Sequence, residues 1–402
     1  MDLFPSLTPL TPPHSEEARL GWLRLLRSRR VGVATFFRLM AEHGSADAAL
    51  DALPGVAAAA GVTDYKTCPP GVAAAELKAG RLAGAQLIAF GSAEYPLALY
   101  DLTDPPPLLW AMGDLSLLTR PAIALVGARN ASSLGTRMAR KMADDLGQAG
   151  YVVVSGLARG IDTAAHLAAL PHGTVAVMAG GVDVVYPAEN AVLAQEIGER
   201  GLRISEQPMG LQPQAMHFPR RNRIISGVVQ AVVVVEAAAR SGSLITARDA
   251  LDQGRDVMAV PGHPFDARAS GCNMLIRDGA TLVRGADDVL AALGPATDIA
   301  LSDSASTPRD AVAQPNTPRL VAQVAAPRAA APVQSAPKAA RSLRDTNALH
   351  QKILDRLGPS PLAEDQLIRD LSLTAGEVAP QLVSLELDGR IVRQPGGLIA
   401  LL

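Results

Sequence analysis

Aromatic residues and cysteines are both scarce in this chain of 402 residues. Phe, Trp and Tyr make up 3% of the sequence, whereas 48% of the residues are hydrophobic and glycine is abundant. This composition favours helices packed on parallel strands over an all-β sandwich. The two cysteines, Cys68 and Cys272, form neither a disulfide framework nor a zinc site, so they fit a reducing, cytoplasmic setting. No metal site and no cofactor are expected.

The sequence also lacks a charge excess and a long apolar run. The 37 basic and 39 acidic side chains give a net charge of -2, so a polyanionic partner would need a local basic patch. A membrane span is not expected, because no uninterrupted run reaches the roughly 18 apolar residues that a spanning helix needs. The N-terminal MDLFPSLTPLTPPHSEE has no basic n-region and no apolar h-region, so no signal peptide is expected.

The length and the shifts in composition predict several domains. The segment from 295 to 345 is rich in Ala and Pro and has no aromatic residue, so we expect a disordered linker. On either side of it we predict a small all-α, helical-hairpin or SAM-like module at 15–80, a Rossmann-like domain at 90–294 and a winged-helix domain at 346–402.

The N-terminal module is predicted from its capping residues. Ser15 and the two acids that follow it predict a helix start, and Gly44 predicts a helix end. Ser45 predicts the next start, with the helix stopping at Pro54. A helix pair with a glycine-containing turn can bind a nucleic-acid backbone, but packing is the favoured interpretation for this one.

The C-terminal segment has winged-helix order, with three helical patterns followed by two short strands around a Pro-Gly-Gly turn. A helix that binds the DNA groove presents Lys or Arg. Here the third helical pattern carries Glu377, Glu386 and Asp388 but no basic residue, and only Arg390 and Arg393 in the wing are basic. We therefore expect a protein-interaction role rather than duplex binding.

Between 121 and 290, apolar strand-like runs alternate with helical patterns. Continuous Val-rich and Ile-rich runs are typical of strands buried on both faces. They predict a doubly wound parallel sheet, with runs beginning at 122, 151, 174, 231 and 256 and helical patterns at 133–149, 162–170, 189–200, 219–229 and 243–253.

Glycines and small polar residues follow several of these strands, where ligands bind in an open parallel sheet. Helix starts at such positions offer unpaired N–H groups and a positive dipole to an anion. The predicted anion-binding residues are Gly127, Arg129 and Ser132 after the first strand, Gly156 and Arg159 after the second, and Ser241, Gly242, Ser243 and Thr246 after the strand ending at 236.

Familiar nucleotide fingerprints are missing from these strand ends. The first strand is not followed by G-x-G-x-x-G, and the second lacks the expected acidic ribose-binding residue. G-x-x-x-x-G-K-[ST] is absent as well, which disfavours a P-loop NTPase.

Asp162 and His166 raise the possibility of an enzyme. They are four residues apart and share a helix face, as an acid–base pair in a nucleotide hydrolase or transferase could. No nucleophile and no metal-ligand spacing accompany them. We therefore favour a helix-capping role for Asp162 and a packing role for His166.

The stretch FPRRNRIISG, residues 218–227, places three arginines at a predicted helix start, where they oppose the helix dipole. A phosphodiester backbone would neutralise both. Arg220 and Arg223 share a helix face, Arg221 points elsewhere, and the following isoleucines turn toward the sheet. Asn222 lies among these arginines and is predicted to bind nucleic acid with them. Phe218 is the best candidate for stacking on bases, and Tyr95 and Tyr186 are weaker ones.

A series of motifs resembles the DprA/Smf family of DNA-processing proteins. VGARNASSLG, VVSGLARGIDTAAH, GTVAVMAGGVDVVYPAEN, FPRRNRIISG and SGSLITARDALDQGRDVMAVPG occur in this order, and the likeness extends to an entry segment at 95–114 before the sheet. The resemblance covers residues 90 to 290 closely. The terminal domains match by pattern more than by motif.

The resemblance implies a non-catalytic protein that binds and protects single-stranded DNA in natural transformation and loads RecA recombinase onto it. It implies a strand-binding pocket made by Arg129, the backbone near Gly127, the FPRRNR arginines and the SGSLIT turn. It also implies a homodimer through the Rossmann-like domain, at residues that would include Met274, Leu275, Ile276 and Leu282. The enzyme remains the alternative, and an adaptor acting only through its terminal domains is a third hypothesis.

Overall fold

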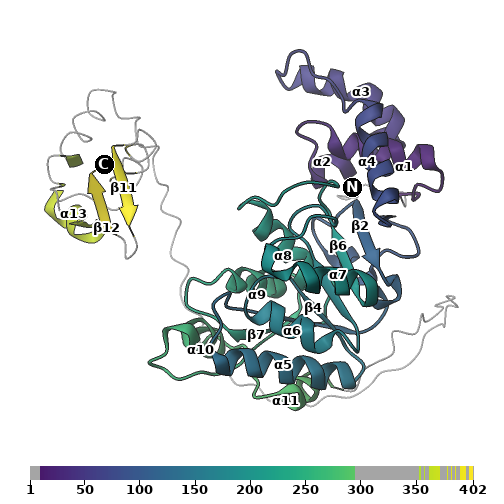
Figure 1. Ribbon diagram of the computed structural model, residues 1–402. Helices are drawn as coiled ribbons and strands as arrows, with labels where there is room; N and C mark the ends of the chain where they lie inside the picture. The colour runs from purple at the N-terminus through teal and green to yellow at the C-terminus, as the bar shows by residue number, and fades with distance from the viewer. Residues whose placement is uncertain are drawn as a thin grey trace, which may run out of the picture. The chain divides into compact units, whose positions relative to one another are not determined.

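The structure is a computed structural model that describes residues 10–294 continuously and, beyond them, residues 353–354, 357, 362–371, 378, 382, 385, 390–394 and 398–401. It divides into two units, Met1–Asp303 and Ser304–Leu402, which are described separately (Figure 1). The predicted linker at 295–345 lies outside the described residues. None of the helices described is long and apolar enough to cross a membrane.

The first unit begins with four helices: α1 (Glu16–Arg27), α2 (Val33–His43), α3 (Ala46–Ala59) and α4 (Pro70–Leu82). Ser15 and Ser45 are N-caps, as predicted, since each hydroxyl accepts a bond from the backbone N–H three residues on. Gly44 ends α2 with a φ of 74°. The prediction that the third helix stops at Pro54 is wrong. Proline removes one backbone hydrogen bond, but burial of Leu53 and Ala57 on either side holds the helix together.

A nine-stranded sheet forms the centre of the unit, in the order β1-β2-β6-β5-β4-β3-β7-β8-β9. Its strands are β1 (Gln86–Ala89), β2 (Leu108–Gly113), β3 (Ala122–Gly127), β4 (Val152–Ser155), β5 (Thr174–Val177), β6 (Leu202–Ser205), β7 (Ala231–Glu236), β8 (Asp256–Ala259) and β9 (Thr281–Leu282). The strands from β6 to β9 are parallel, which confirms the predicted sheet.

One edge of the sheet differs from the prediction. β2 is antiparallel to both β6 and β1, so the segment at 95–114 does not simply precede the sheet but contributes a strand to it. The short apolar run of β2 follows three prolines at 105–107, and only the short 3-10 helix Leu115–Leu118 lies between it and β3. It therefore lacks the strand–helix alternation by which the central strands are recognised.

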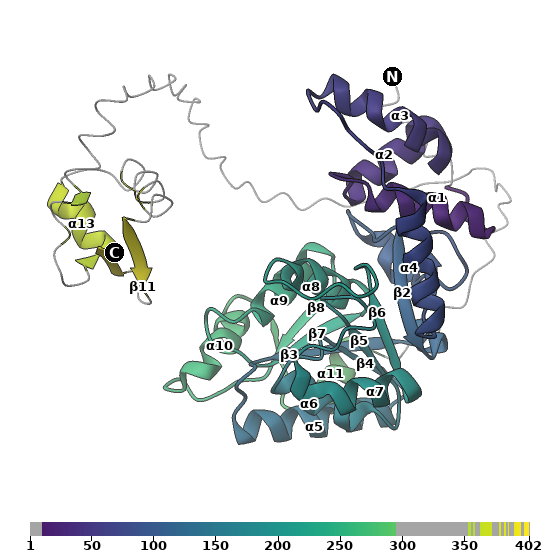
Figure 2. The ribbon, with the colours of Figure 1, turned by 45° about the horizontal axis from the view of Figure 1, so that its top comes forward.

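Helices cover both faces of the sheet (Figure 2). In β7, Val233 packs with the helices of one face and Val234 with those of the other, as the two-residue period of a strand requires. One face carries α5 (Ser133–Gln148), α6 (Ile161–Ala169), α7 (Ala191–Arg200) and α11 (Ala286–Leu293), and the opposite face carries α8 (His217–Gly227), α9 (Ser243–Asp252) and α10 (Ser270–Arg277).

The helical module packs directly on the sheet edge. The indole N–H of Trp110, on β2, donates to the Glu76 carboxylate at 2.9 Å, and the same carboxylate pairs with Arg27 at 2.9 Å. Gly80 on α4 faces the Trp110 ring so closely that an added Cβ would overlap it. Trp110 is 2% exposed and shares a core with α1 to α4. The module and the sheet are therefore one packed body.

The second unit contains β10 (Leu362–Ala363), α13 (Glu364–Leu371), β11 (Ile391–Gln394) and β12 (Leu398–Leu401). Its sheet has the order β10-β12-β11, and the antiparallel pairing of Ile391 with Leu401 confirms the predicted hairpin. This is the wing of a winged helix. Glu377, Glu386 and Asp388, on which the doubt about duplex binding depends, lie outside the described residues.

Candidate nucleic-acid interface

A pocket of about 900 Å³ lies at the carboxyl ends of β3 and β7. The chain progresses from β3 through β4, β5 and β6 on one side and from β7 through β8 and β9 on the other, so the strand order reverses between β3 and β7. Ligands bind at such switch points in open α/β sheets. We call it the switch-point pocket; the predicted residues that line it are Gly127, Arg129, Phe218, Arg221, Asn222, Ser241, Gly242, Ser243 and Thr246.

One wall of the switch-point pocket is a stack of Arg129, Phe218 and Tyr186. The guanidinium carbon of Arg129 lies 5.2 Å from the centroid of the Phe218 ring, and the Tyr186 and Phe218 rings are 5.7 Å apart. This geometry is that of a cation–π contact beside a tilted aromatic pair. Tyr95, the other weak stacking candidate, is 3% exposed and donates its hydroxyl to the Pro106 carbonyl, so it cannot reach a base.

The floor of the pocket is Arg221. Its side chain is buried, and Nη1 donates to the carbonyls of Gly156 at 2.6 Å and Val177 at 2.5 Å. The guanidinium therefore joins the ends of β4 and β5. Burial lowers the pKa of Arg221 to about 10, which still leaves it protonated at neutral pH. Gly156 is required here, because a Cβ would overlap the Arg221 guanidinium.

Asp162 and His166 do not form an acid–base pair at the pocket. The buried Asp162 carboxylate accepts bonds from the N–H groups of Gly156 at 3.1 Å and Ala158 at 3.3 Å, so it caps the turn before α6 rather than the helix itself. Burial raises the pKa of Asp162, and the Arg221 charge opposes that rise.

His166 is buried beneath that turn and does not line the pocket. Its Nδ1 lies 2.7 Å from the Thr174 hydroxyl, which in turn donates to the Val153 carbonyl. Burial lowers the pKa of His166 to about 3, so the imidazole is neutral and its ring is held by the fold. The packing role that we favoured from the sequence is what this geometry supports.

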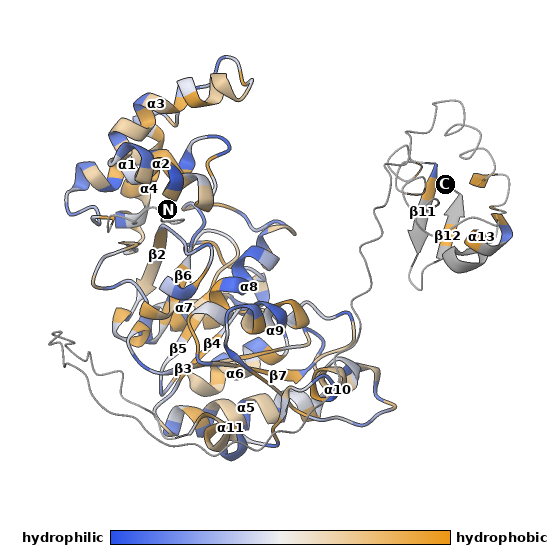
Figure 3. Ribbon diagram, turned by 180° about the vertical axis from the view of Figure 1, so that it is seen from behind, coloured by the Kyte–Doolittle hydropathy of each residue, from blue (hydrophilic) through white to orange (hydrophobic). Residues whose placement is uncertain are grey.

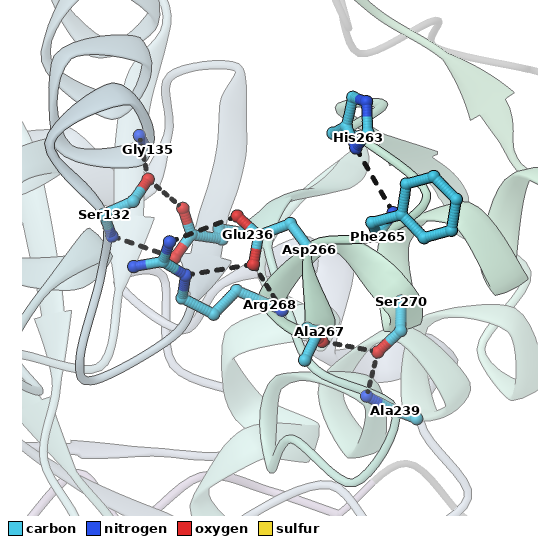
Figure 4. A network of polar contacts seen from close by, with 10 residues as sticks. All are labelled: Ser132, Gly135, Glu236, Ala239, His263, Phe265, Asp266, Ala267, Arg268 and Ser270. Atoms are coloured by element: carbon cyan, nitrogen blue, oxygen red, sulfur yellow. Dashed lines mark hydrogen bonds and ion pairs between the residues drawn. The ribbon is translucent and has the colours of Figure 1, made fainter.

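Ser132 is bound to Glu236, the last residue of β7 (Figure 4). The Ser132 backbone N–H donates to Glu236 at 3.0 Å, its hydroxyl also donates to that carboxylate, and its oxygen accepts from the N–H of Gly135 at 2.9 Å. Ser132 therefore caps α5 and joins the β3 and β7 ends rather than lining the pocket. Nearby, Arg268 reaches the pocket while pairing with Asp266 at 3.1 Å.

Three predicted arginines lie outside the switch-point pocket. Arg159 lines a neighbouring hollow of about 360 Å³, shared with Gly156, and its Nη1 is 3.7 Å from Glu189. Arg220 and Arg223 lie on the other side of α8, in a hollow of about 440 Å³. The arginines of FPRRNR therefore do not form a single wall.

Sequence reasoning missed Arg240 in this pocket. Arg240 is exposed and directly precedes Ser241 in the turn after β7, so its position at a strand end was the available signal. Within residues 10–294, neither Arg129 nor Arg240 takes part in an ion pair within 4.0 Å. Two uncompensated guanidinium groups thus flank the pocket.

Family comparison agrees with this architecture. Residues 86–294 match the family described as DNA recombination-mediator protein A, residues 16–79 match a DprA-like N-terminal HHH domain, and residues 337–397 match a DprA winged helix domain. The chain belongs to the DNA recombination-mediator protein A family, DprA/Smf.

Individual members of this family are similar over large parts of their length. The DNA processing protein DprA of Streptococcus pneumoniae is 48% identical over 199 residues, 49% of this chain and 70% of that protein. An X-ray structure of the pneumococcal protein superposes with a TM-score of 0.51 and 42% identity, over 56% of this chain and 82% of that one. A structure of DNA processing protein A from Helicobacter pylori, which concerns its single-stranded DNA binding mode, has a TM-score of 0.48 and 30% identity over 52% of this chain and 95% of that one.

Proposed function

We propose that this chain binds single-stranded DNA at the switch-point pocket without catalysing a reaction on it. The observation that carries the proposal is the stack of Arg129 on Phe218 in a pocket that also holds Arg240. Within the described ranges, Arg129 forms no ion pair with an acid. Phosphates would contact the two guanidinium groups and the small turn at Ser241–Ser243, and bases would stack on Phe218 and Tyr186.

The aromatic pair favours a single strand over a duplex. Base–aromatic stacking requires an exposed base face, which a paired and stacked duplex does not offer, and it tolerates every base. We therefore expect binding with little sequence preference.

Family membership supports the wider role that the resemblance implies. We propose that the bound strand is protected and passed to RecA recombinase in natural transformation, in the cytoplasm. We also propose a homodimer through the free edge of the sheet at β9, where Leu282 is 44% exposed. Met274, Leu275 and Ile276 on the adjacent α10 are only partly buried, so they offer apolar surface there.

The nucleotide hydrolase is not proposed, because His166 is neutral, lies outside the pocket and is held by Thr174. The adaptor hypothesis predicts that the pocket is dispensable for DNA binding. The effect of Phe218→Ala on single-strand binding separates the adaptor hypothesis from the proposal.

The first prediction concerns stacking. Phe218→Ala should lower the affinity for a labelled single strand by about 1–3 kcal/mol per stacked base, measured by fluorescence anisotropy. Duplex affinity and the unfolding midpoint should change little. Phe265→Ala is the matched control, because Phe265 is 94% exposed and lies outside the pocket. Equal loss for single strand and duplex would argue against base stacking in the pocket.

A further inference from the structure

The aromatic wall of the switch-point pocket has a second side. Arg129, Tyr186 and Phe218 line that pocket and also the hollow of about 360 Å³ next to it. We call this neighbour the β4–β5 hollow, because it is lined by the turn after β4 at 156–159 and by the segment 186–189 that follows β5. Pocket and hollow are therefore the two sides of one stack of side chains.

The two rings of this wall keep surface that the fold does not cover. Tyr186 is 49% exposed, and Phe218 is half-buried. Figure 3 shows hydrophilic colouring on α8, so the Phe218 ring is partly exposed in a polar setting. Because both rings line the pocket and the hollow, a base can stack on either side of the wall.

The fold holds the backbone of Arg159 beside this stack. Gly160 has a φ of 78°, and a Cβ there would overlap the Ala128 carbonyl, so the turn after β4 packs directly on the segment that carries Arg129. The N–H of Ile161 also donates to the Ala128 carbonyl at 3.2 Å. The backbone is therefore fixed at the hollow, and a ligand has only the Arg159 side chain to order.

The β4–β5 hollow has a net positive charge. Arg129 and Arg159 line it, and among the described residues of its lining Glu189 is the one acid. Nη1 of Arg159 lies 3.7 Å from Oε1 of Glu189, which is too far for a hydrogen bond, and the two side chains are 61% and 64% exposed. Such an exposed ion pair is weak, so a phosphate can replace Glu189 as the partner of Arg159.

We infer that the bound single strand straddles the Arg129–Phe218–Tyr186 stack, with one nucleotide in the switch-point pocket and the next in the β4–β5 hollow, where Arg159 holds a phosphate. This inference rests on the proposed function. It gives a role to Arg159, which lies outside the switch-point pocket. It also gives the two members of the ion pair opposite effects, since Arg159 attracts the strand and Glu189 repels it.

The test uses a labelled oligothymidylate of about 4 nucleotides, the lower end of the site sizes of single-strand binders, so that only adjacent positions are filled. Arg159→Ala should weaken its binding roughly tenfold, the effect of one charge-assisted hydrogen bond, and should reduce the salt slope by about 0.7. Glu189→Gln should strengthen binding about two- to fivefold at low salt, because it removes a like charge. Fluorescence anisotropy measures both effects.

The matched controls are Arg200→Ala and Glu196→Gln. These two residues form an exposed ion pair of the same 3.7 Å length on α7, and neither lines the pocket or the hollow. Both control variants should therefore bind the short strand as the wild type does.

Wild-type affinity in either Arg159→Ala or Glu189→Gln would overturn the inference. A loss in Arg159→Ala that appears only with strands of about 16 nucleotides would overturn it as well, because Arg159 would then contact a distant part of the strand. Failure of the proposed function looks different, since Arg129→Ala would then leave the affinity for the short strand unchanged.

Discussion

Arg220, Arg221 and Arg223 are close neighbours in sequence but have three different environments. Arg220 is exposed, Arg221 is buried against two strand-end carbonyls, and Arg223 is paired with two acids. A helix turns by 100° per residue, so adjacent side chains must point in different directions. The sequence could predict that Arg221 differs from the other two, but not which of them contacts DNA, because that depends on elements far away in the chain.

A comparison of Arg221→Ala with Arg129→Ala tests which of the two arginines stabilises the fold. Arg221→Ala should reduce the free energy of unfolding by roughly 1–3 kcal/mol for each of the two carbonyls that it leaves buried without a donor, and it also removes the charge that opposes the desolvation of Asp162. Urea unfolding followed by circular dichroism measures this. Arg129→Ala, which removes an exposed arginine, should stay within about 0.5 kcal/mol of the wild type. Similar small changes for both variants would show that Arg221 is not a structural residue.

His166 gives the fold a predictable response to acid. Its pKa falls from 6.5 in the unfolded chain to about 3 in the folded one, so the unfolded state binds more protons between these values. The stability contributed by neutral His166 is complete above pH 6.5 and is lost as the pH falls toward 3. The slope contributed by this residue should approach 1.4 kcal/mol per pH unit, as for any single proton.

The measurement for His166 is the urea midpoint between pH 7 and pH 4. A His166→Leu variant should lose that part of the pH dependence while keeping the rest of the acid response, which includes Asp162. An unchanged pH profile in the variant would mean that the pKa of His166 does not differ between the folded and unfolded states.

At the scale of elements, the buried central strands could be predicted and the edge strands could not. β3, β4, β5, β7 and β8 are continuous apolar runs because helices cover both faces. β1 and β2 form the antiparallel end of the sheet, and β9, at the other end, has two residues. β6 is as long as β4 and β5, but Arg203 interrupts its apolar run. The extension of α3 through Pro54 was unpredictable for a related reason, since tertiary packing outweighs one lost hydrogen bond.

The joint between α4 and β2 is the contact that makes the helical module part of the larger body. Gly80→Ala should destabilise the protein by about 1–3 kcal/mol, because the added methyl group would overlap the Trp110 ring. Gly71→Ala on the same helix is the matched control. That position is open, so alanine should be neutral or stabilise by up to about 1 kcal/mol. Urea unfolding of both variants, compared at the same pH, measures the difference; a destabilised Gly71→Ala would mean that the loss comes from α4 itself.

At the scale of the whole molecule, the sequence located the site but not its composition. Glycines and small polar residues after successive strands predicted the carboxyl rim, and the switch point between β3 and β7 gathers most of them. The sequence could not show that Ser132 is bound to Glu236 or that Arg240 reaches the pocket, because both depend on how separate strand ends meet.

The near-neutral charge of the chain is compatible with a polyanionic ligand because the basic groups are placed locally. Arg129 and Arg240 line the switch-point pocket. Several other arginines are neutralised by ion pairs elsewhere in the fold, namely Arg27, Arg38, Arg81, Arg200, Arg255 and Arg284. Such an arrangement concentrates positive potential where a strand would bind, without raising the net charge above -2.

The salt dependence of single-strand affinity tests this account most directly. The affinity of a long oligothymidylate is measured from low to moderate salt for the wild type, for Arg129→Ala/Arg240→Ala and for Arg137→Ala/Arg140→Ala, a pair of exposed arginines on α5 with the same charge loss. The account predicts that the slope of log K against log salt falls by about 1 to 2 only in the pocket variant, which also binds more weakly at every salt concentration. Identical slopes and affinities for the two double variants would contradict it.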